Sequence, residues 1–320
     1  MPKPVIGITM GDPAGIGPEI VAKALRNPHI RSICNPVVFG TSRFLLPAAH
    51  YETVQHASEA TFGKRKTYVV EVKASNRIRV GKGSAFSGKA ALAYLDKAVK
   101  CMLCGEVDAI VTAPVSKAAI RAAGTRDFIG HTEYLAEMTG AASFAMMFYS
   151  RRLKVTLVTT HLPLKLVASS ITITKILDAI TLSNDVVKKL SSRKPRIGVA
   201  GLNPHAGEQR AFGAEDSEII APAVRLARRR GIHAEGPIPA DTLFRAAYNG
   251  DYDLVVAMYH DQALAPFKMM AFEEGVNVTL GLPIIRTSVD HGTAFDIAGK
   301  GIASEKSLLE AIKLAVRIAK

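Results

Sequence analysis

The stretch LVVAMYH at residues 254–260 places a histidine directly after a run of β-type residues. The same arrangement recurs in VTLVTTH at residues 155–161 and in IGVAGLNPH at residues 197–205. Ligands of an open, mostly parallel α/β sheet gather outside the carboxyl ends of its strands, so histidines at three such ends could meet at one point. Three neutral imidazoles with one open position form a catalytic metal site. The pattern predicts an α/β fold and a metal bound by His161, His205 and His260.

Each of these histidines, considered alone, also has an explanation that involves no metal. One histidine after a strand is more often a loop residue that is hydrogen-bonded to the backbone than a metal ligand. Six of the nine histidines follow no such β-type run, which weakens this alternative for the three that do. Both interpretations stay open at this point, because the pattern does not show that the three side chains meet in space.

The composition is that of an ordinary globular protein, with 48% hydrophobic and 22% charged residues in a chain of 320. This length is at the upper limit for one hydrophobic core, so we expect two domains or one large α/β unit. No apolar stretch approaches the ~18 residues of a membrane span. The apolar start at residues 5–10 is not followed by a cleavage-type site, so we expect a cytoplasmic protein with no membrane partner.

The net charge of +13 raises the question of a nucleic-acid partner. The Lys and Arg residues are scattered, with short clusters only at residues 64–66 and 228–230, and aromatic residues make up 6% of the chain. None of them interleaves the clusters as a base-stacking surface requires. We therefore expect no nucleic-acid partner, whereas a positive field suits a small anionic substrate.

The cysteines number three, and an odd count argues against a disulfide framework. Cys101 and Cys104 form a C-x-x-C that closes a helical pattern, whereas a redox dithiol needs the positive end at a helix N-terminus. We therefore expect two buried structural thiols.

Strand and helix patterns alternate along the chain, which is typical of a parallel sheet. Strands are expected at residues 4–10, 36–40, 108–112, 143–149 and 153–160, and helices from Pro18 to about Leu25 and at 88–104, 116–123, 172–190 and 215–230. Residues 41–86 are least informative, with short β-type pieces at 67–72 and 77–80. The loop GDPAGIG at residues 11–17 lacks the third glycine of G-x-G-x-x-G, so it is no evidence for a Rossmann fingerprint.

Two polar segments have both a structural and a functional interpretation. Thr132 is predicted to be the N-cap of a helix that ends near Gly140. The free N–H groups of such a helix start bind anions, and His131 and Thr132 could add donors for a phosphate. A plain cap beside a surface histidine explains these residues equally well, and Asp241 could likewise be a helix cap or an active-site carboxylate.

Taken together, the segments resemble the 4-hydroxythreonine-4-phosphate dehydrogenase family of pyridoxal phosphate synthesis. The resemblance rests on seven ordered motifs: ITMGDPAGIGPEI (8–20), GHTE (130–133), THLPL (160–164), GLNPHAGE (201–208), PADT (239–242), YHDQ (259–262) and RTSVDHGT (286–293). It implies two α/β/α domains of the isopropylmalate dehydrogenase type, with the active site in the cleft between them. Domain 1 would comprise residues 1–128 and 285–320 with NAD-binding elements, and domain 2 residues 129–284 with the metal ligands and the dimer contacts.

The resemblance also implies roles for single residues. The metal site of His161, His205 and His260 would lie at a homodimer interface, with ligands from both subunits. Imidazole ligands favour zinc, or cobalt, over magnesium. The phosphorylated hydroxy-acid substrate would contact His131, Thr132, Lys268, Asn277 and Arg286, and NAD would contact His291, Gly292 and Asp296. Asp296 would accept the ribose 2′-hydroxyl and repel a 2′-phosphate, while Asp241 and Lys268 are the candidates for the catalytic proton relay.

The chain departs from the family pattern beside two of the metal ligands. Gln209 and Arg210 stand where two glycines are usual, and Ala263 stands where a glycine is usual. Relatives of the family oxidise other four-carbon acid phosphates or unphosphorylated diols. The reaction type is therefore better supported by the residues than the substrate.

The expected reaction is NAD- and metal-dependent oxidation of 4-phosphohydroxy-L-threonine at C3, followed by decarboxylation to 3-amino-2-oxopropyl phosphate in pyridoxal 5′-phosphate biosynthesis. The alternative is oxidative decarboxylation of D-threonate or D-erythronate 4-phosphate in acid-sugar catabolism. A metal-dependent hydrolase and a nucleic-acid binder are more distant alternatives, because neither explains the loop at residues 290–299.

Overall fold

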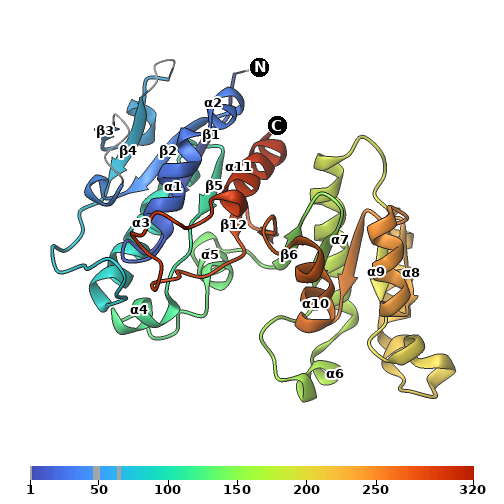
Figure 1. The fold of residues 1–320 in the computed structure, drawn as a ribbon. Helices are drawn as coiled ribbons and strands as arrows, with labels where there is room; N and C mark the ends of the chain where they lie inside the picture. The colour runs from blue at the N-terminus through green and yellow to red at the C-terminus, as the bar shows by residue number, and fades with distance from the viewer. Residues whose placement is uncertain (1, 46–50, 63–65) are drawn as a thin grey trace. The chain divides into compact units, whose positions relative to one another are not determined.

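The computed structural model describes residues 2–45, 51–62 and 66–320, and the chain folds into two compact units (Figure 1). Unit 1 comprises Met1–Gly140 and Pro283–Lys320, and unit 2 comprises Ala141–Leu282. Unit 2 begins later than the predicted residue 129 because helix α5 (His131–Thr139) belongs with unit 1. There the Tyr134 hydroxyl donates to Asp96 Oδ1 of helix α3 (Ala85–Leu103) at 2.7 Å.

Unit 1 is built on a parallel sheet in the order β3-β4-β2-β1-β5-β12. The strands are β1 (Val5–Thr9), β2 (Asn35–Gly40), β3 (Tyr51–Val54), β4 (Thr67–Glu71), β5 (Ala109–Thr112) and β12 (Arg286–Val289). The helices besides α3 and α5 are α1 (Gly17–Arg26), α2 (Pro28–Ile33), α4 (Lys117–Ala122) and α11 (Lys306–Ala319). The central strands β2, β1 and β5 are almost entirely buried because helices cover the sheet. Helix α3 packs on β1, β2 and β5, and α11 packs on β5 and β12.

Unit 2 is built on a mixed sheet in the order β11-β6-β7-β10-β8-β9. The strands are β6 (Ala145–Tyr149), β7 (Lys154–Leu157), β8 (Ile197–Ala200), β9 (Ala234–Ile238), β10 (Leu254–Ala257) and β11 (Val276–Leu280). The helices are α6 (Val167–Ser170), α7 (Ile173–Leu190), α8 (Ala221–Arg229), α9 (Ala240–Asn249) and α10 (His260–Ala271). Only the β11–β6 and β6–β7 pairs among those described are antiparallel. One core cluster joins α9 and α10 to β7 and β10 through Phe244, Phe267, Val155 and Val255.

The predicted α/β class and most predicted elements are confirmed, but three local predictions are wrong. Residues 77–80 form no strand, and only an isolated bridge joins Arg79 to Lys82. The N-cap of α5 is Gly130, so Thr132 lies inside the first turn. The thiol of Cys101 is buried as expected, whereas Cys104 is exposed because it is the C-cap of α3.

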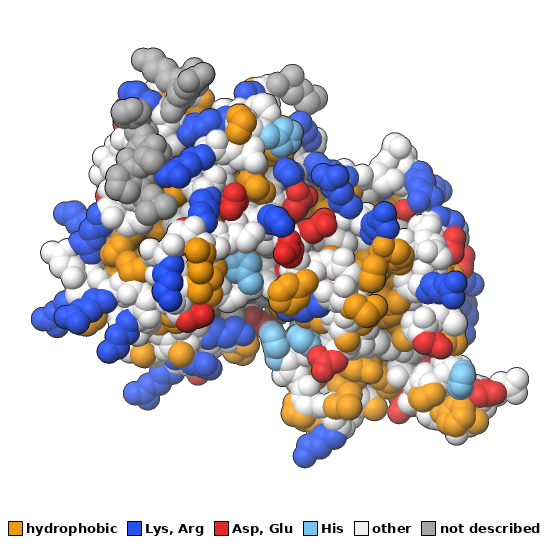
Figure 2. All heavy atoms as spheres, viewed as in Figure 1, with side chains coloured by type: hydrophobic (Ala, Val, Ile, Leu, Met, Phe, Trp, Pro, Cys, Tyr) orange, Lys and Arg blue, Asp and Glu red, His pale blue; other side chains and the backbone are white. Residues whose placement is uncertain are grey.

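Basic side chains are spread over the viewed faces of both units, without a single dominant patch (Figure 2). Two residues of the cluster predicted at 64–66, residues 64 and 65, lie outside the described part of the chain. Within the described part, no single helix is both long and apolar enough to cross a membrane.

Candidate functional site

The three histidines that follow β-type runs lie after three neighbouring strands of unit 2. His161 follows β7, His260 is the first residue of α10 after β10, and His205 lies in the turn Pro204–Arg210 after β8. Because β7, β10 and β8 are parallel neighbours, their carboxyl ends share one edge of the sheet. The rings of His161 and His260 lie near each other, with centroids 5.9 Å apart.

Hydrogen bonds hold these strand ends together. Thr159 donates from its backbone N–H and from its hydroxyl to the Met258 carbonyl, at 3.1 and 2.7 Å. The Gln262 amide donates to the Gly201 carbonyl at 2.7 Å and accepts from the Met258 N–H at 2.7 Å. The segments that carry the three histidines are therefore connected through β10.

His260 has a partner that sets the direction of its free nitrogen. Its Nδ1 lies 2.6 Å from Asp261 Oδ1. A carboxylate that accepts the Nδ1 proton leaves Nε2 as the unprotonated nitrogen, the form that binds a metal. Asp261 is thus placed to orient His260, a contact that the YHDQ motif contains but histidine spacing alone does not reveal.

His205 lies in a turn with unusual backbone geometry. His205, Ala206, Glu208, Gln209 and Arg210 all have φ between 36° and 81°, in the left-handed region. The buried Asp216 carboxylate holds the start of this turn by accepting from the backbone N–H groups of residues 202 and 203, at 2.8 and 3.1 Å. The His205 ring packs beside Phe212, with centroids 6.1 Å apart.

The three histidines lie at one edge of the sheet, but their ligand atoms do not all come within 4.8 Å of one another in this chain. Across the described ranges, the only three His, Cys, Asp or Glu side chains whose ligand atoms all lie within 4.8 Å of one another are in unit 1. The metal role of His161, His205 and His260 therefore stays a prediction. The donor chemistry of three imidazoles, one of them oriented by a carboxylate, fits a divalent metal.

Unit 1 contains a concentration of positive groups at the start of α5. Arg286 is only 3% exposed, and its Nε and Nη2 donate to Thr112 Oγ1 at 3.1 and 2.8 Å. Burial lowers the pKa of Arg286, while the nearby Glu133 opposes this shift. A guanidinium nevertheless stays charged at neutral pH. A buried guanidinium near a helix N-terminus is a group that recognises phosphate and carboxylate ligands.

His131 lies at the same place. Its Nε2 is buried and has no hydrogen-bond partner among the residues that the structure describes. Burial, and then the charges of Arg286 and Lys117, hold the pKa of His131 well below its usual range. The ring is therefore neutral near pH 7, and its buried nitrogen is available to a bound ligand.

Lys117 is a candidate residue that the sequence analysis missed. It is the first residue of α4, and a Cβ built on Gly130 would lie 3.8 Å from its Nζ. Lys117 thus places a second cation, with Arg286, near the α5 N-terminus, where the Glu133 carboxylate also lies, with its Oε2 3.1 Å from the same Cβ. Its place just after β5 was the available signal, because ligands bind beyond the carboxyl ends of parallel strands.

The other predicted substrate and proton-relay residues belong to unit 2. Lys268 is half-buried in α10, and Asn277 is half-buried on β11, opposite Phe148. Asp241 is exposed in the first turn of α9. These positions do not test the predicted roles.

The predicted cofactor residues lie on the loop that follows β12. His291 and Asp296 are exposed, and Gly292 would tolerate a Cβ without a contact. The loop packs on the first glycine-rich segment: the Ile16 N–H donates to the Thr293 carbonyl at 3.0 Å, and a Cβ on Gly15 would lie 2.8 Å from that oxygen. Gly15 therefore allows the close approach of two loops, a role that the Rossmann comparison did not suggest.

The chain is similar to known proteins over nearly its whole length. The family model described as pyridoxal phosphate biosynthetic protein PdxA matches residues 32–315. The 4-hydroxythreonine-4-phosphate dehydrogenase of Desulforapulum autotrophicum is 46% identical over 323 residues, which cover 98% of this chain and 95% of that protein. The D-threonate 4-phosphate dehydrogenase of Cupriavidus necator is also 46% identical, over 325 residues that cover 99% and 97%.

Solved structures extend the likeness to the fold. The crystal structure of the 4-hydroxythreonine-4-phosphate dehydrogenase of Klebsiella pneumoniae has a TM-score of 0.89 at 40% identity and covers 99% of this chain and 100% of that one. An isocitrate dehydrogenase from Methylococcus capsulatus, 12% identical with a TM-score of 0.51 over 96% of this chain and 83% of that one, shares the fold alone. The expected fold relationship is confirmed. The chain belongs to the PdxA family and is an oxidoreductase of the dehydrogenase type.

Proposed function

We propose that the protein oxidises and decarboxylates 4-phosphohydroxy-L-threonine, with NAD and a divalent metal, in pyridoxal 5′-phosphate biosynthesis. The observation that carries the proposal is the group of charged side chains at the start of α5, where Arg286 and Lys117 lie close enough to the buried His131 ring to lower its pKa. Two hydrogen-bonding cations beside a helix N-terminus suit a phosphate group.

A second substrate has specific support. The relative that acts on D-threonate 4-phosphate is as similar to this chain as the one that acts on 4-hydroxythreonine 4-phosphate, at 46% identity each. Both names contain a phosphate on carbon 4, so the unit 1 cluster suits either compound. Oxidation of D-threonate or D-erythronate 4-phosphate is therefore the second candidate function.

Some residues of this chain would bind the substrate, and others would transfer a proton. Arg286 and Lys117 would hold the phosphate, while His131 and Thr132 would donate to it together with the α5 backbone. In unit 2, Lys268 and Asn277 would contact the rest of the substrate. Asp241 and Lys268 would move the proton that the reacting hydroxyl loses.

Two bound groups would supply the chemistry that side chains lack. NAD provides a hydride acceptor, and a divalent metal, zinc before cobalt or magnesium, provides a Lewis acid for the hydroxyl oxygen. His291, Gly292 and Asp296 would contact NAD, and His161, His205 and His260 would hold the metal. The family resemblance also implies a homodimer with the metal at its interface, which we include in the proposal.

The experiment is NADH formation by the purified protein on 4-phosphohydroxy-L-threonine, D-threonate 4-phosphate and D-erythronate 4-phosphate, each with and without a chelator. Chelator-sensitive NADH formation from the first compound alone is the expected result. Preference for either of the other two compounds would support the second candidate function instead. Turnover of a phosphate ester without NAD, or no NADH from any compound, would overturn the dehydrogenase assignment.

A further inference from the structure

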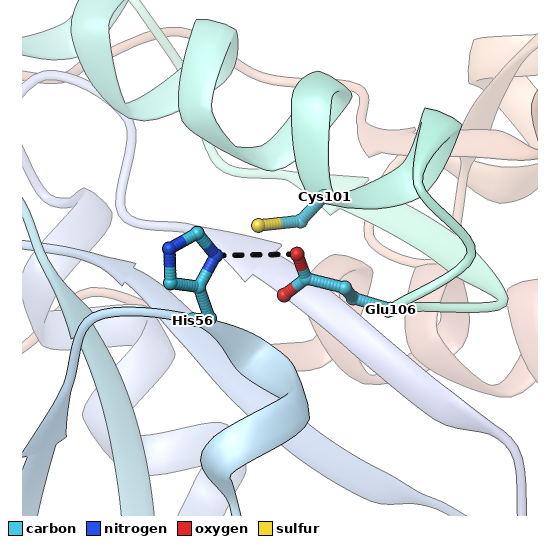
Figure 3. Close-up of side chains that lie close together, drawn as sticks. All are labelled: His56, Cys101 and Glu106. Atoms are coloured by element: carbon cyan, nitrogen blue, oxygen red, sulfur yellow. Dashed lines mark hydrogen bonds and ion pairs between the residues drawn. The ribbon is translucent and has the colours of Figure 1, made fainter.

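A second group of metal-ligating side chains lies in unit 1. Figure 3 shows His56, Cys101 and Glu106 pointing toward one another. They come from separate places: His56 precedes the short turn Ala57–Glu59, Cys101 lies in the last turn of α3, and Glu106 follows that helix. One ligand atom from each lies within 4.8 Å of the other two, and His56 Nδ1 is 3.3 Å from Glu106 Oε1.

The local structure holds two of these groups in place. Glu106 Oε2 accepts from the Ala57 and Ser58 backbone N–H groups at 2.8 and 3.3 Å, which directs Oε1 toward His56. Cys101 is 2% exposed, and its thiol is hydrogen-bonded with Glu106. The His56 side chain is 54% exposed, so an ion can reach the group from solvent.

The donor set defines the class of ion. Sulfur, imidazole nitrogen and carboxylate oxygen together are typical of Zn²⁺, with bonds of about 2.3, 2.0 and 2.1 Å in a tetrahedron. Such bonds separate ligand atoms by about 3.3 to 3.7 Å, so groups already within 4.8 Å of one another need only small shifts. Magnesium prefers oxygen ligands and does not suit this set.

We propose that His56, Cys101 and Glu106 bind a zinc-class divalent cation, with water as the fourth ligand. The site is separate from the substrate cluster, because Glu106 precedes Ala109 at the amino end of β5, whereas Thr112 lies at the other end beside Arg286. The ion would tie the turn after β3 to the end of α3. Its role is therefore structural, and the site is independent of the proposed reaction.

The test is a cobalt titration of the full-length protein with its thiols kept reduced. A cobalt–thiolate bond gives a charge-transfer absorption in the near ultraviolet, whereas the predicted three-histidine site contains no sulfur. We expect this absorption to rise to a plateau in the wild type as Co²⁺ is added. The absorption should disappear in Cys101→Ser and weaken in His56→Ala, but persist in His161→Ala.

Two further variants separate binding from folding. Cys104→Ser removes an exposed thiol three residues away and should leave the absorption intact. Glu106→Gln keeps an oxygen acceptor for the Ala57 N–H but removes the charged ligand, so it should fold normally and bind cobalt weakly. Zinc should also raise the melting temperature of the metal-free wild type and of Cys104→Ser by more than that of Glu106→Gln, which keeps only the three-histidine site. No sulfur absorption in the wild type, or one that survives Cys101→Ser, would overturn the proposal.

Discussion

At the residue scale, Arg286 is the buried cation on which the proposed phosphate site depends. Arg286→Lys keeps the charge but loses the planar fork that reaches Thr112 with two nitrogens. Because one charge-assisted hydrogen bond is worth about 1.5–3 kcal/mol, we expect KM for the phosphorylated substrate to rise at least about tenfold. Steady-state kinetics measure this, with the exposed Arg317→Lys as the control. An unchanged KM in a folded variant would remove Arg286 from the site.

Lys117 allows a test that separates binding from packing. Lys117→Ala should weaken the binding of inorganic phosphate by about tenfold, which corresponds to about 1.4 kcal/mol, as measured by calorimetry. Apart from burial, the charge of Lys117 helps to lower the pKa of His131, so that pKa should rise in the variant when followed by NMR. Arg121→Ala, on the exposed part of the same helix, should change neither quantity. Weaker phosphate binding with an unmoved His131 pKa would indicate only a structural role.

At the scale of elements, Glu19 joins α1 to the segment before α11. Burial favours the protonated acid, but the Lys23 ammonium and the Ala303 and Gly301 N–H groups outweigh it and hold the pKa of Glu19 below its usual range. A lowered pKa in the folded state gives stability that is present above the ordinary carboxyl pKa of about 4.3 and is lost as pH falls through the folded value.

The Glu19→Gln variant tests this linkage. We expect it to lower the free energy of unfolding by about 1–3 kcal/mol at pH 7, because charge-assisted hydrogen bonds are lost. The difference from wild type should shrink as pH falls below about 4 and through the lowered pKa of folded Glu19, below which both proteins carry a neutral side chain. Urea unfolding at several pH values measures both, with the exposed Glu52→Gln as the control. A difference that stays constant with pH would contradict the assigned ionic role.

The turn after β8 has a backbone geometry that glycine adopts without strain. Gln209 and Arg210 have φ of 52° and 81°, where an L-residue is strained by about 1–2 kcal/mol. Gln209→Gly removes that strain but adds about 0.5–1 kcal/mol of chain entropy to the unfolded state. We expect the free energy of unfolding to rise by about 0.5–1 kcal/mol, as measured with urea. Gln209→Ala, which truncates the side chain without freeing the backbone, should show no gain; an equal gain would place the effect in the side chain.

At the scale of the whole molecule, the net charge of +13 should favour anionic substrates. Salt screens such a field, with a Debye length of about 10 Å at 0.1 M. We expect kcat/KM for the phosphorylated substrate to fall several-fold as ionic strength rises from about 0.01 to 0.1 M, and to fall less for an unphosphorylated hydroxy acid. Equal losses for both compounds would mean that salt acts on the enzyme and not on its attraction for phosphate.

Much of the architecture could be predicted because local patterns and topology agree. Two elements were predictable from their own sequences. Strand β10 is an apolar run, and α7 is a long helix that begins after the Thr172 cap. The start of α5 was misplaced because Thr132 is a good capping residue, yet Gly130 occupies the cap with fully extended backbone. The strand expected at residues 77–80 does not form because short β-type pieces depend on a pairing partner, which a local pattern does not show.

By itself, the sequence determined the α/β class, the three histidines at strand ends and the family, because hydrophobic period and ordered motifs are local properties. Only the tertiary structure decided which charged side chains lie close to one another. Arg286 and Lys117 are far apart in the chain, but both affect the same buried imidazole. The sequence spacing of His56, Cys101 and Glu106 likewise matches no metal-binding motif. Folding brings them together because the turn after β3 lies against the end of α3, a contact set by packing rather than by any motif.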